Sequence, residues 1–177
     1  MRDETDKAKL QEFLKALGER VRGPGAVFLT GGGTALLLGW RPMTVDIDLK
    51  ASPEPAGFFE AIAELKDQLN VNVELASPDD FIPEVLGWRE RSVFIARHGD
   101  IDFFHYDPVS QALAKIERGH ARDLLDVTAM CEREMVTREQ LWQSYLSIED
   151  ALIHYPAIDP PTFRSAVIAV CSTGGES

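Results

Sequence analysis

The spacing of hydrophobic residues changes several times along the chain and predicts helices and strands in a definite order. Leu10, Phe13, Leu14, Leu17 and Val21 recur at helical spacing within residues 6–22. A second helix is expected from Ser52-Pro53 to Leu69. Short apolar or alternating runs predict strands over 26–29, 45–49, 71–75, 92–96 and 101–106. From Pro108 onward the spacing is helical, so the pattern predicts an α+β fold with a mixed β-sheet flanked by helices and a helical C-terminal part.

The chain has 177 residues and contains neither an internal repeat nor a low-complexity linker. We therefore expect a single domain, with a sheet-containing core over 1–107 and a helical part over 108–177. No apolar run approaches the ~18 residues of a membrane span, and the charged start lacks a secretory signal. Cys131 and Cys171 lie 40 positions apart without metal-binding spacing, which favours reduced thiols in a cytoplasmic protein.

The stretch from Leu29 to Leu49 carries the clearest chemistry. Because side chains alternate along a strand, Asp46 and Asp48 are expected on one face and Ile47 on the other. Two neighbouring carboxylates repel each other unless a cation lies between them, and Mg²⁺ is the usual ion for such oxygen ligands. Upstream, Gly31-Gly32-Gly33 precedes a short helical run, where a backbone without Cβ atoms can approach a phosphate.

These elements resemble the nucleotidyltransferase signature of the DNA polymerase beta superfamily. Gly32 and Gly33 are followed by twelve residues and then by Asp-Ile-Asp-Leu over 46–49. The stretch is similar to the small bacterial AbiEii-type toxins, which carry an Arg and a Thr before this motif. The resemblance, which covers roughly residues 26–128, implies a nucleotidyltransferase fold. It also implies nucleotide-binding roles for a set of residues in this stretch: Gly32, Gly33, Thr34, Arg41 and Thr44.

The same resemblance calls for a third acidic residue on a neighbouring strand. Asp102 is the best candidate, with the role of metal ligand and base toward the attacking hydroxyl. Asp107, directly before Pro108, is predicted to cap a helix. His105 is predicted to be a packed strand residue and not a catalytic base.

A later run, LAKIERGHARDLLDV, resembles a second motif of the AbiEii-like group, in which a Lys precedes Arg-Asp. By that resemblance Lys115 and Arg122 would bind the nucleotide, with Lys115 on its phosphates and Asp123 orienting the helix or a basic residue. The alternative is a helix surface joined by ion pairs. Trp88, with the arginines on either side of Glu90, similarly allows two interpretations: a frame for a substrate, or a core-capping Trp among surface ion pairs.

The resemblance implies an enzyme that uses one or two Mg²⁺ ions to transfer NMP from an NTP to a hydroxyl group. As the toxin of a toxin–antitoxin pair it would modify tRNA or protein and bind a cognate antitoxin. The net charge of −11 argues against sequence-independent nucleic-acid binding and suits a small-molecule acceptor better, as in aminoglycoside nucleotidyltransferases. A third possibility is a non-enzymatic module that binds nucleotide or protein.

Overall fold

The computed structural model describes residues 3–172, and within this range the chain divides into two compact units. The first unit contains the residues up to Ser77 together with Ser92–Tyr106. The second unit contains Pro78–Arg91 and the residues from Asp107 onward. The division at Asp107 lies one residue from the boundary expected between sheet and helices. Residues 78–91, expected in the sheet-containing part, belong to the second unit.

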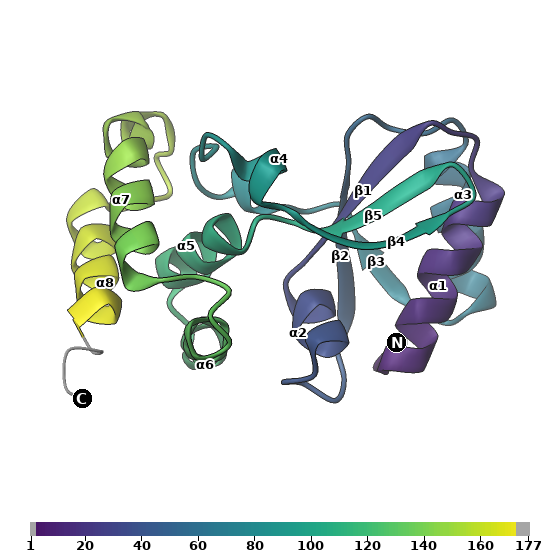
Figure 1. Cartoon of the computed structure of the whole chain (residues 1–177), viewed down its shortest axis with the longest axis horizontal. Coiled ribbons are helices and arrows are strands. Elements are labelled where there is room, and N and C mark those ends of the chain that lie inside the picture. Colours follow the sequence, from purple (N-terminus) through teal and green to yellow (C-terminus); the bar gives the residue numbers. More distant parts are fainter. Residues whose placement is uncertain (1–2, 173–177) are drawn as a thin grey trace. The chain divides into compact units, whose positions relative to one another are not determined.

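The first unit is built on a mixed five-stranded sheet with the order β3-β2-β1-β5-β4 (Figure 1). Its strands are β1 (Gly25–Thr30), β2 (Asp46–Ala51), β3 (Asn72–Glu74), β4 (Val93–His98) and β5 (Ile101–His105). The central strand β1 runs antiparallel to β2 and parallel to β5, while β3 is parallel to β2 and β4 is antiparallel to β5. The predicted α+β class with a mixed sheet flanked by helices is confirmed.

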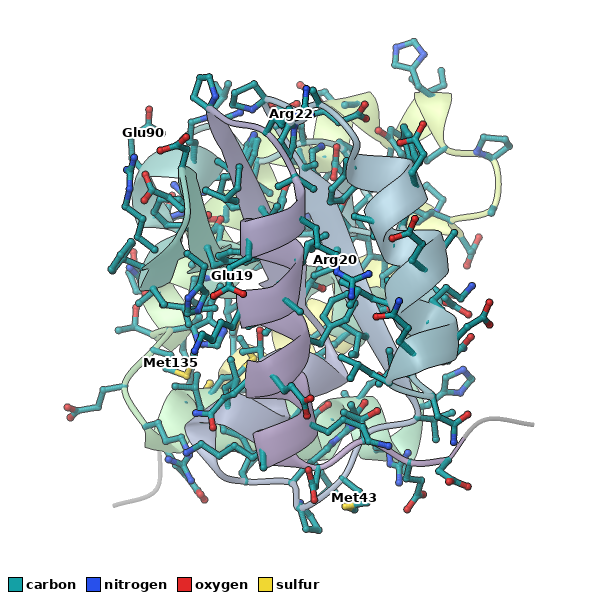
Figure 2. All side chains as sticks on the ribbon, turned by 90° about the vertical axis from the view of Figure 1, so that its right-hand side faces the viewer. Glu19, Arg20, Arg22, Met43, Glu90 and Met135 are labelled. Carbon is teal, nitrogen blue, oxygen red and sulfur yellow. The ribbon has the colours of Figure 1, made fainter. Side chains whose placement is uncertain are left out.

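One face of this sheet forms the hydrophobic core with helices α1 (Lys7–Arg20) and α3 (Phe58–Gln68). The sheet residues of the core alternate along their strands, as the sequence pattern predicts: Val27, Leu29, Ile47, Leu49, Val73, Ile101 and Phe103. Figure 2 shows Arg20 reaching from α1 toward α3, where its guanidinium donates to Glu64 at 3.1 Å. The residues between these core positions, which include both predicted aspartates, point to the other face of the sheet.

Two helices of the first unit begin at other residues than the sequence predicts. The short helix α2 spans Gly32–Leu38 and so includes two of the three glycines. Helix α3 begins at Phe58, six residues after the predicted start at Ser52. The reason is that residues 52–56 pair with the chain around β1: Ser52 donates to the carbonyl of Ala26, and Arg22 and Ala56 exchange two backbone hydrogen bonds. These bonds keep the segment extended.

The second unit is helical (Figure 1). Its elements are η1 (Pro78–Asp80), α4 (Trp88–Arg91), α5 (Pro108–Arg118), α6 (Ala121–Glu132), α7 (Arg138–Ile148), η2 (Glu149–His154) and α8 (Pro160–Ser172). The Asp107 carboxylate accepts from the backbone N–H groups of Val109 and Ser110, which confirms the predicted cap. Thr137 forms a capping box with Gln140 at the start of α7. Tyr145 of α7 packs edge-on against Phe163 of α8 in the core of this unit.

The helices and the two cysteines bear on the expectations about membrane spans and thiols. Across residues 3–172, every helix is too short or too polar to cross a lipid bilayer. Cys131 and Cys171 are both free thiols and both half-buried. Burial raises the pKa of each thiol above its ordinary value, which lowers the fraction of reactive thiolate.

Candidate functional site

Asp46 and Asp48 lie on the face of the sheet opposite the hydrophobic core, where β3 follows β2 in parallel. Directly across the strand pair, Asp46 stands opposite Asn72 and Asp48 stands opposite Glu74. We call these four residues the aspartate face. Both aspartates are partly exposed, whereas Ile47 between them is fully buried. The predicted placement of the two carboxylates on one face, away from the core, is confirmed.

The glycine turn, residues 31–33, stands directly against the second aspartate. Gly31 has a φ of +65°, a left-handed conformation that L side chains rarely adopt. A Cβ atom at this position would lie 3.0 Å from the Oδ2 atom of Asp48. The register of the sheet explains the proximity, because Asp48 pairs with Thr30, the residue immediately before the turn. Glycine at position 31 therefore allows this carboxylate to lie close against the backbone of the turn.

Arg41 and Thr44 flank the next glycine of the turn. A Cβ atom on Gly32 would overlap the Thr44 hydroxyl and would lie 3.7 Å from a guanidinium nitrogen of Arg41. Thr44 is fixed by two backbone hydrogen bonds with Thr5, and its hydroxyl donates to the backbone carbonyl of Asp46 at 3.0 Å. The structure therefore brings together predicted residues that are up to sixteen positions apart in the sequence. Arg41 supplies a cation beside a site that is otherwise rich in carboxylates.

Gly33 and Thr34, two of the predicted nucleotide contacts, also make packing contacts in the interior of the first unit. A Cβ atom on Gly33 would lie 2.8 Å from the Cδ1 atom of Leu29, so this glycine allows α2 to pack closely against β1. The Thr34 side chain is 1% exposed. Its hydroxyl lies 3.3 Å from the Leu29 carbonyl, to which it donates, and 3.0 Å from Nδ1 of His105. Both residues stabilise the interior of the first unit.

His105 is a buried strand residue, as predicted. Burial lowers its pKa from 6.5 to about 4, so the ring is neutral at physiological pH. Because the Thr34 hydroxyl gives its only proton to a carbonyl, the ring nitrogen Nδ1 is assigned as the donor of the pair. A neutral imidazole committed to a buried threonine has no part in the chemistry of the aspartate face.

This buried ring predicts a pH dependence of stability. The folded protein holds the His105 proton less tightly than the unfolded chain, so stability is complete above about pH 6.5 and is lost as the pH falls toward 4. The loss over this interval is about 3 kcal/mol. Urea unfolding at a series of pH values should show this slope, and His105→Gln should flatten it. His154→Gln, at an exposed position, is the control. An unchanged slope in His105→Gln would refute the assignment.

The structure does not bring Asp102 to the other two aspartates. Asp102 shares their face of the sheet, but it stands beside Ala26, whereas Asp48 stands beside Thr30. Four residues of extended strand separate these positions by about 13 Å. Arg97 of β4 also donates to the Asp102 carboxylate at 3.2 Å. Asp102 therefore belongs to a partly exposed ion pair at the far end of β1.

Glu74 takes the position that the sequence prediction gave to Asp102. It lies on the strand next to β2, directly opposite Asp48, and its side chain is exposed. Neighbouring strands lie about 4.8 Å apart, so two carboxylates at opposed positions can reach a common ligand. The sequence indicated this placement of Glu74 through the alternating run Val-Asn-Val-Glu-Leu at 71–75. In such a strand Asn72 and Glu74 lie on the same face.

The donor set of the aspartate face suits a hard divalent cation. Asp46, Asp48 and Glu74 offer carboxylate oxygens from adjacent positions, and the glycine turn lets the Asp48 carboxylate lie close to the backbone. Within residues 3–172, the side chains do not gather three His, Cys, Asp or Glu groups around one point. Asp46, Asp48 and Glu74 nevertheless lie on one face of adjacent strands, and the side chains of Asp48 and Glu74 would have to turn to meet the Asp46 carboxylate at one point.

Lys115 and Arg122 lie in the second unit. The Lys115 ammonium is nearly buried, donates to Asp126 at 2.8 Å and lies 4.0 Å from Asp123. Burial tends to raise the pKa of Asp123, but the ion pairs with Arg118 and Lys115 outweigh it and hold this pKa below its ordinary value. The structure thus places Lys115 in a buried ion network between α5 and α6, which differs from the exposed helix surface of the second interpretation. Arg122 is exposed on α6.

The side chains around Trp88 are engaged in contacts with other residues of the second unit. Trp88 is 7% exposed and donates through its indole N–H to Glu84, while the guanidinium of Arg89 lies 4.8 Å above its ring. Arg91 forms a two-point hydrogen-bonded ion pair with Asp107. These contacts correspond to the core-capping interpretation of this segment.

Comparisons with known proteins were made by sequence and by structure. No protein-family model, no curated protein and no solved structure matches this chain.

Proposed function

We propose that the protein is a Mg²⁺-dependent nucleotidyltransferase that transfers NMP from an NTP to a hydroxyl acceptor, with the fold of that superfamily. The observation that carries the proposal is the position of Gly31 against Asp48, with Arg41 and Thr44 against Gly32. A glycine turn that lies against paired carboxylates, with an arginine at its side, suits a triphosphate bound together with a metal ion.

Asp46, Asp48 and Glu74 would hold the cation. When bound, Mg²⁺ would neutralise phosphate charge and orient the α-phosphate for in-line displacement. Arg41 would contact the triphosphate oxygens through its planar guanidinium, which forms two parallel hydrogen bonds to phosphate. Gly31 and Gly32 would let the backbone approach the same oxygens, because no Cβ atom occupies that space.

The proposed reaction forms one bond and breaks one. The acceptor hydroxyl oxygen attacks the α-phosphorus, and a new phosphorus–oxygen bond forms. The bond from that phosphorus to the oxygen bridging it to the β-phosphate breaks, and pyrophosphate leaves with that electron pair. Glu74, the most exposed carboxylate of the aspartate face, would accept the proton of the hydroxyl. Arg41 would stabilise the charge that moves to the leaving group.

Two kinds of molecule are candidates for the acceptor of the NMP group. The net charge of −11 favours a small hydroxylated molecule over tRNA, because sequence-independent binding of RNA depends on dense positive charge. A toxin that modifies tRNA or protein, held inactive by a cognate antitoxin, is the second candidate. Its support is the Arg-x-x-Thr-x-Asp-x-Asp arrangement over 41–48. Growth arrest on expression would favour the toxin.

One experiment separates the enzyme from a binding module. The purified protein is incubated with Mg²⁺ and each of the four NTPs labelled at the α-phosphate, with and without total tRNA, and with a panel of aminoglycosides. Transfer of label to an acceptor, with release of pyrophosphate, supports the proposal. Saturable NTP binding without transfer to any acceptor or to water would point to a nucleotide-binding module, and absence of NTP binding would overturn the proposal.

The third carboxylate can be tested by a pair of matched variants. Glu74→Gln should lower transfer by about 10²–10³-fold, because it removes a ligand and a proton acceptor without changing the size of the side chain. Asp102→Asn should leave transfer nearly unchanged and should cost less than about 1 kcal/mol of stability, since the Arg97–Asp102 pair is largely exposed. Initial rates with labelled NTP provide the measurement. The reverse order of effects would restore the assignment of Asp102.

A further inference from the structure

We infer that Asn72 is a positioning residue that orients Asp46 toward the cation; the inference rests on the proposed function. Asn72 of β3 stands directly opposite Asp46 of β2, and its side-chain amide donates to the Oδ1 atom of Asp46. Asn72 would not touch the metal ion or the nucleotide, and would act through the carboxylate that it holds.

The local sequence makes an asparagine at this position unusual. β3 has only three residues, and its neighbours Val71 and Val73 are buried apolar residues that suit a strand. Asparagine is depleted in strands, because its side chain competes for backbone hydrogen bonds. Asn72 is half-buried and directs its amide to the aspartate across the strand pair. A polar contact therefore occupies a position at which strand propensity favours a β-branched residue.

The contact has two consequences for metal binding. It occupies one oxygen of Asp46 and so leaves Oδ2 as the oxygen available to a cation, with the carboxylate plane fixed. It also supplies the positive end of an amide dipole to a group of three carboxylates, which reduces their mutual repulsion. Partners of this kind orient metal ligands in many proteins, and their loss costs 10–100-fold in metal affinity or activity.

The probe is Mn²⁺, which binds oxygen ligands as Mg²⁺ does and can be followed directly by its paramagnetic signal. Mn²⁺ is titrated into the wild type, Asn72→Ala and Asn72→Val in the presence of NTP. Valine favours the strand conformation, so a loss of binding in Asn72→Val would not come from misfolding of β3. We expect both variants to bind Mn²⁺ 10–100-fold more weakly, with transfer restored at raised Mg²⁺ concentration.

Asn70→Gly is the matched control. Asn70 makes a comparable contact, an amide donated to the carboxylate of Asp3 at 3.0 Å, two positions before Asn72. Its φ is +53°, so glycine is the substitution that its backbone tolerates. This variant should bind Mn²⁺ as the wild type does. An equal loss of affinity in Asn70→Gly would indicate a general effect on the fold and would overturn the assignment of Asn72.

The remaining outcomes distinguish this inference from the proposed function. If the wild type binds Mn²⁺, Asp48→Asn does not, and both Asn72 variants bind as tightly as the wild type, then the positioning role is overturned while the metal site stands. If the wild type itself does not bind Mn²⁺ in the presence of NTP, the proposed function fails together with the inference.

Discussion

Replacing Asp48 with asparagine is expected to lower NMP transfer by about 10³-fold or more, while the protein stays folded. Asp48 is the carboxylate that faces the glycine turn, and it pairs across the strands with Glu74 on one side and Thr30 on the other. Asparagine keeps the size of the side chain but removes the charge that would balance a divalent cation. A preorganised electrostatic contact at a reacting phosphate has an effect of this size.

Transfer of α-labelled NMP and the affinity for Mg²⁺–NTP are measured on the same preparation of Asp48→Asn. Both should fall, while the urea midpoint should stay near that of the wild type, because a partly exposed carboxylate makes little net contribution to folding. Asp100→Asn, at an exposed hairpin position, is the control for the change of net charge. Undiminished transfer by Asp48→Asn would rule out the proposed mechanism, whatever the identity of the acceptor.

The sequence predicted the shared face of Asp46 and Asp48 and the position of the glycine turn because both follow from local rules. Alternation along one strand determines that Asp46 and Asp48 share a face, and a left-handed φ at Gly31 is a property of the turn itself. The family resemblance implied nucleotide-binding roles for Arg41 and Thr44, but it did not predict that both lie against Gly32. The structure explains it by backbone pairing of Thr44 with Thr5, a long-range contact that no local pattern predicts.

The distance of Asp102 from Asp48 could not be predicted, because strand register is not a local property. Asp102 and Asp48 share a face, and alternation predicts that much. Their separation depends on how far β5 is shifted along β1, and the register puts Asp102 beside Ala26, four residues from the partner of Asp48. Glu74 is brought opposite Asp48 by the parallel pairing of β2 and β3, which depends on the helix between them.

Lys115 and Thr34 show a second limit of sequence reasoning. Each residue type is suited to binding phosphate, and each lies in a run that resembles a nucleotide-binding motif. The Thr34 side chain is buried, and its hydroxyl is hydrogen-bonded to Leu29 and His105, so it is not available to a phosphate. Lys115 pairs with Asp126 eleven residues later, on the next helix. The sequence contains the acidic residue that pairs with Lys115. Only the fold shows that the two side chains are close enough to form an ion pair.

Replacing Asp107 with alanine is expected to destabilise the second unit by about 3 kcal/mol or more. Asp107 is fully buried, and its carboxylate accepts from Nε and Nη2 of Arg91 at 3.1 and 2.8 Å. These two donors lie on one edge of the guanidinium. The Asp107 carboxylate also accepts from the Ser110 hydroxyl at 2.7 Å and caps α5. Alanine removes the cap, at a cost of about 1 kcal/mol, and leaves a partly buried guanidinium without its carboxylate, which costs more.

Tryptophan fluorescence during urea unfolding provides the measurement, since Trp88 and Trp142 both lie in the second unit. Asp107→Asn keeps an acceptor for the cap but loses the charge, so its loss of stability should be smaller than that of alanine. Arg91→Ala combined with Asp107→Ala gives the coupling energy of the pair, which should exceed about 1 kcal/mol if the ion pair itself stabilises the unit.

A coupling near zero would leave only the helix cap as the contribution of Asp107. The buried side chains of Ile82, Val85 and Trp88 would then be the contacts that hold residues 78–91 in the second unit. Arg91 joins this segment to α5 through Asp107, and its guanidinium donates to the Leu86 carbonyl at 2.9 Å within the same segment. A large coupling energy would therefore explain why the chain leaves the sheet after Ser77 and returns to it at Ser92.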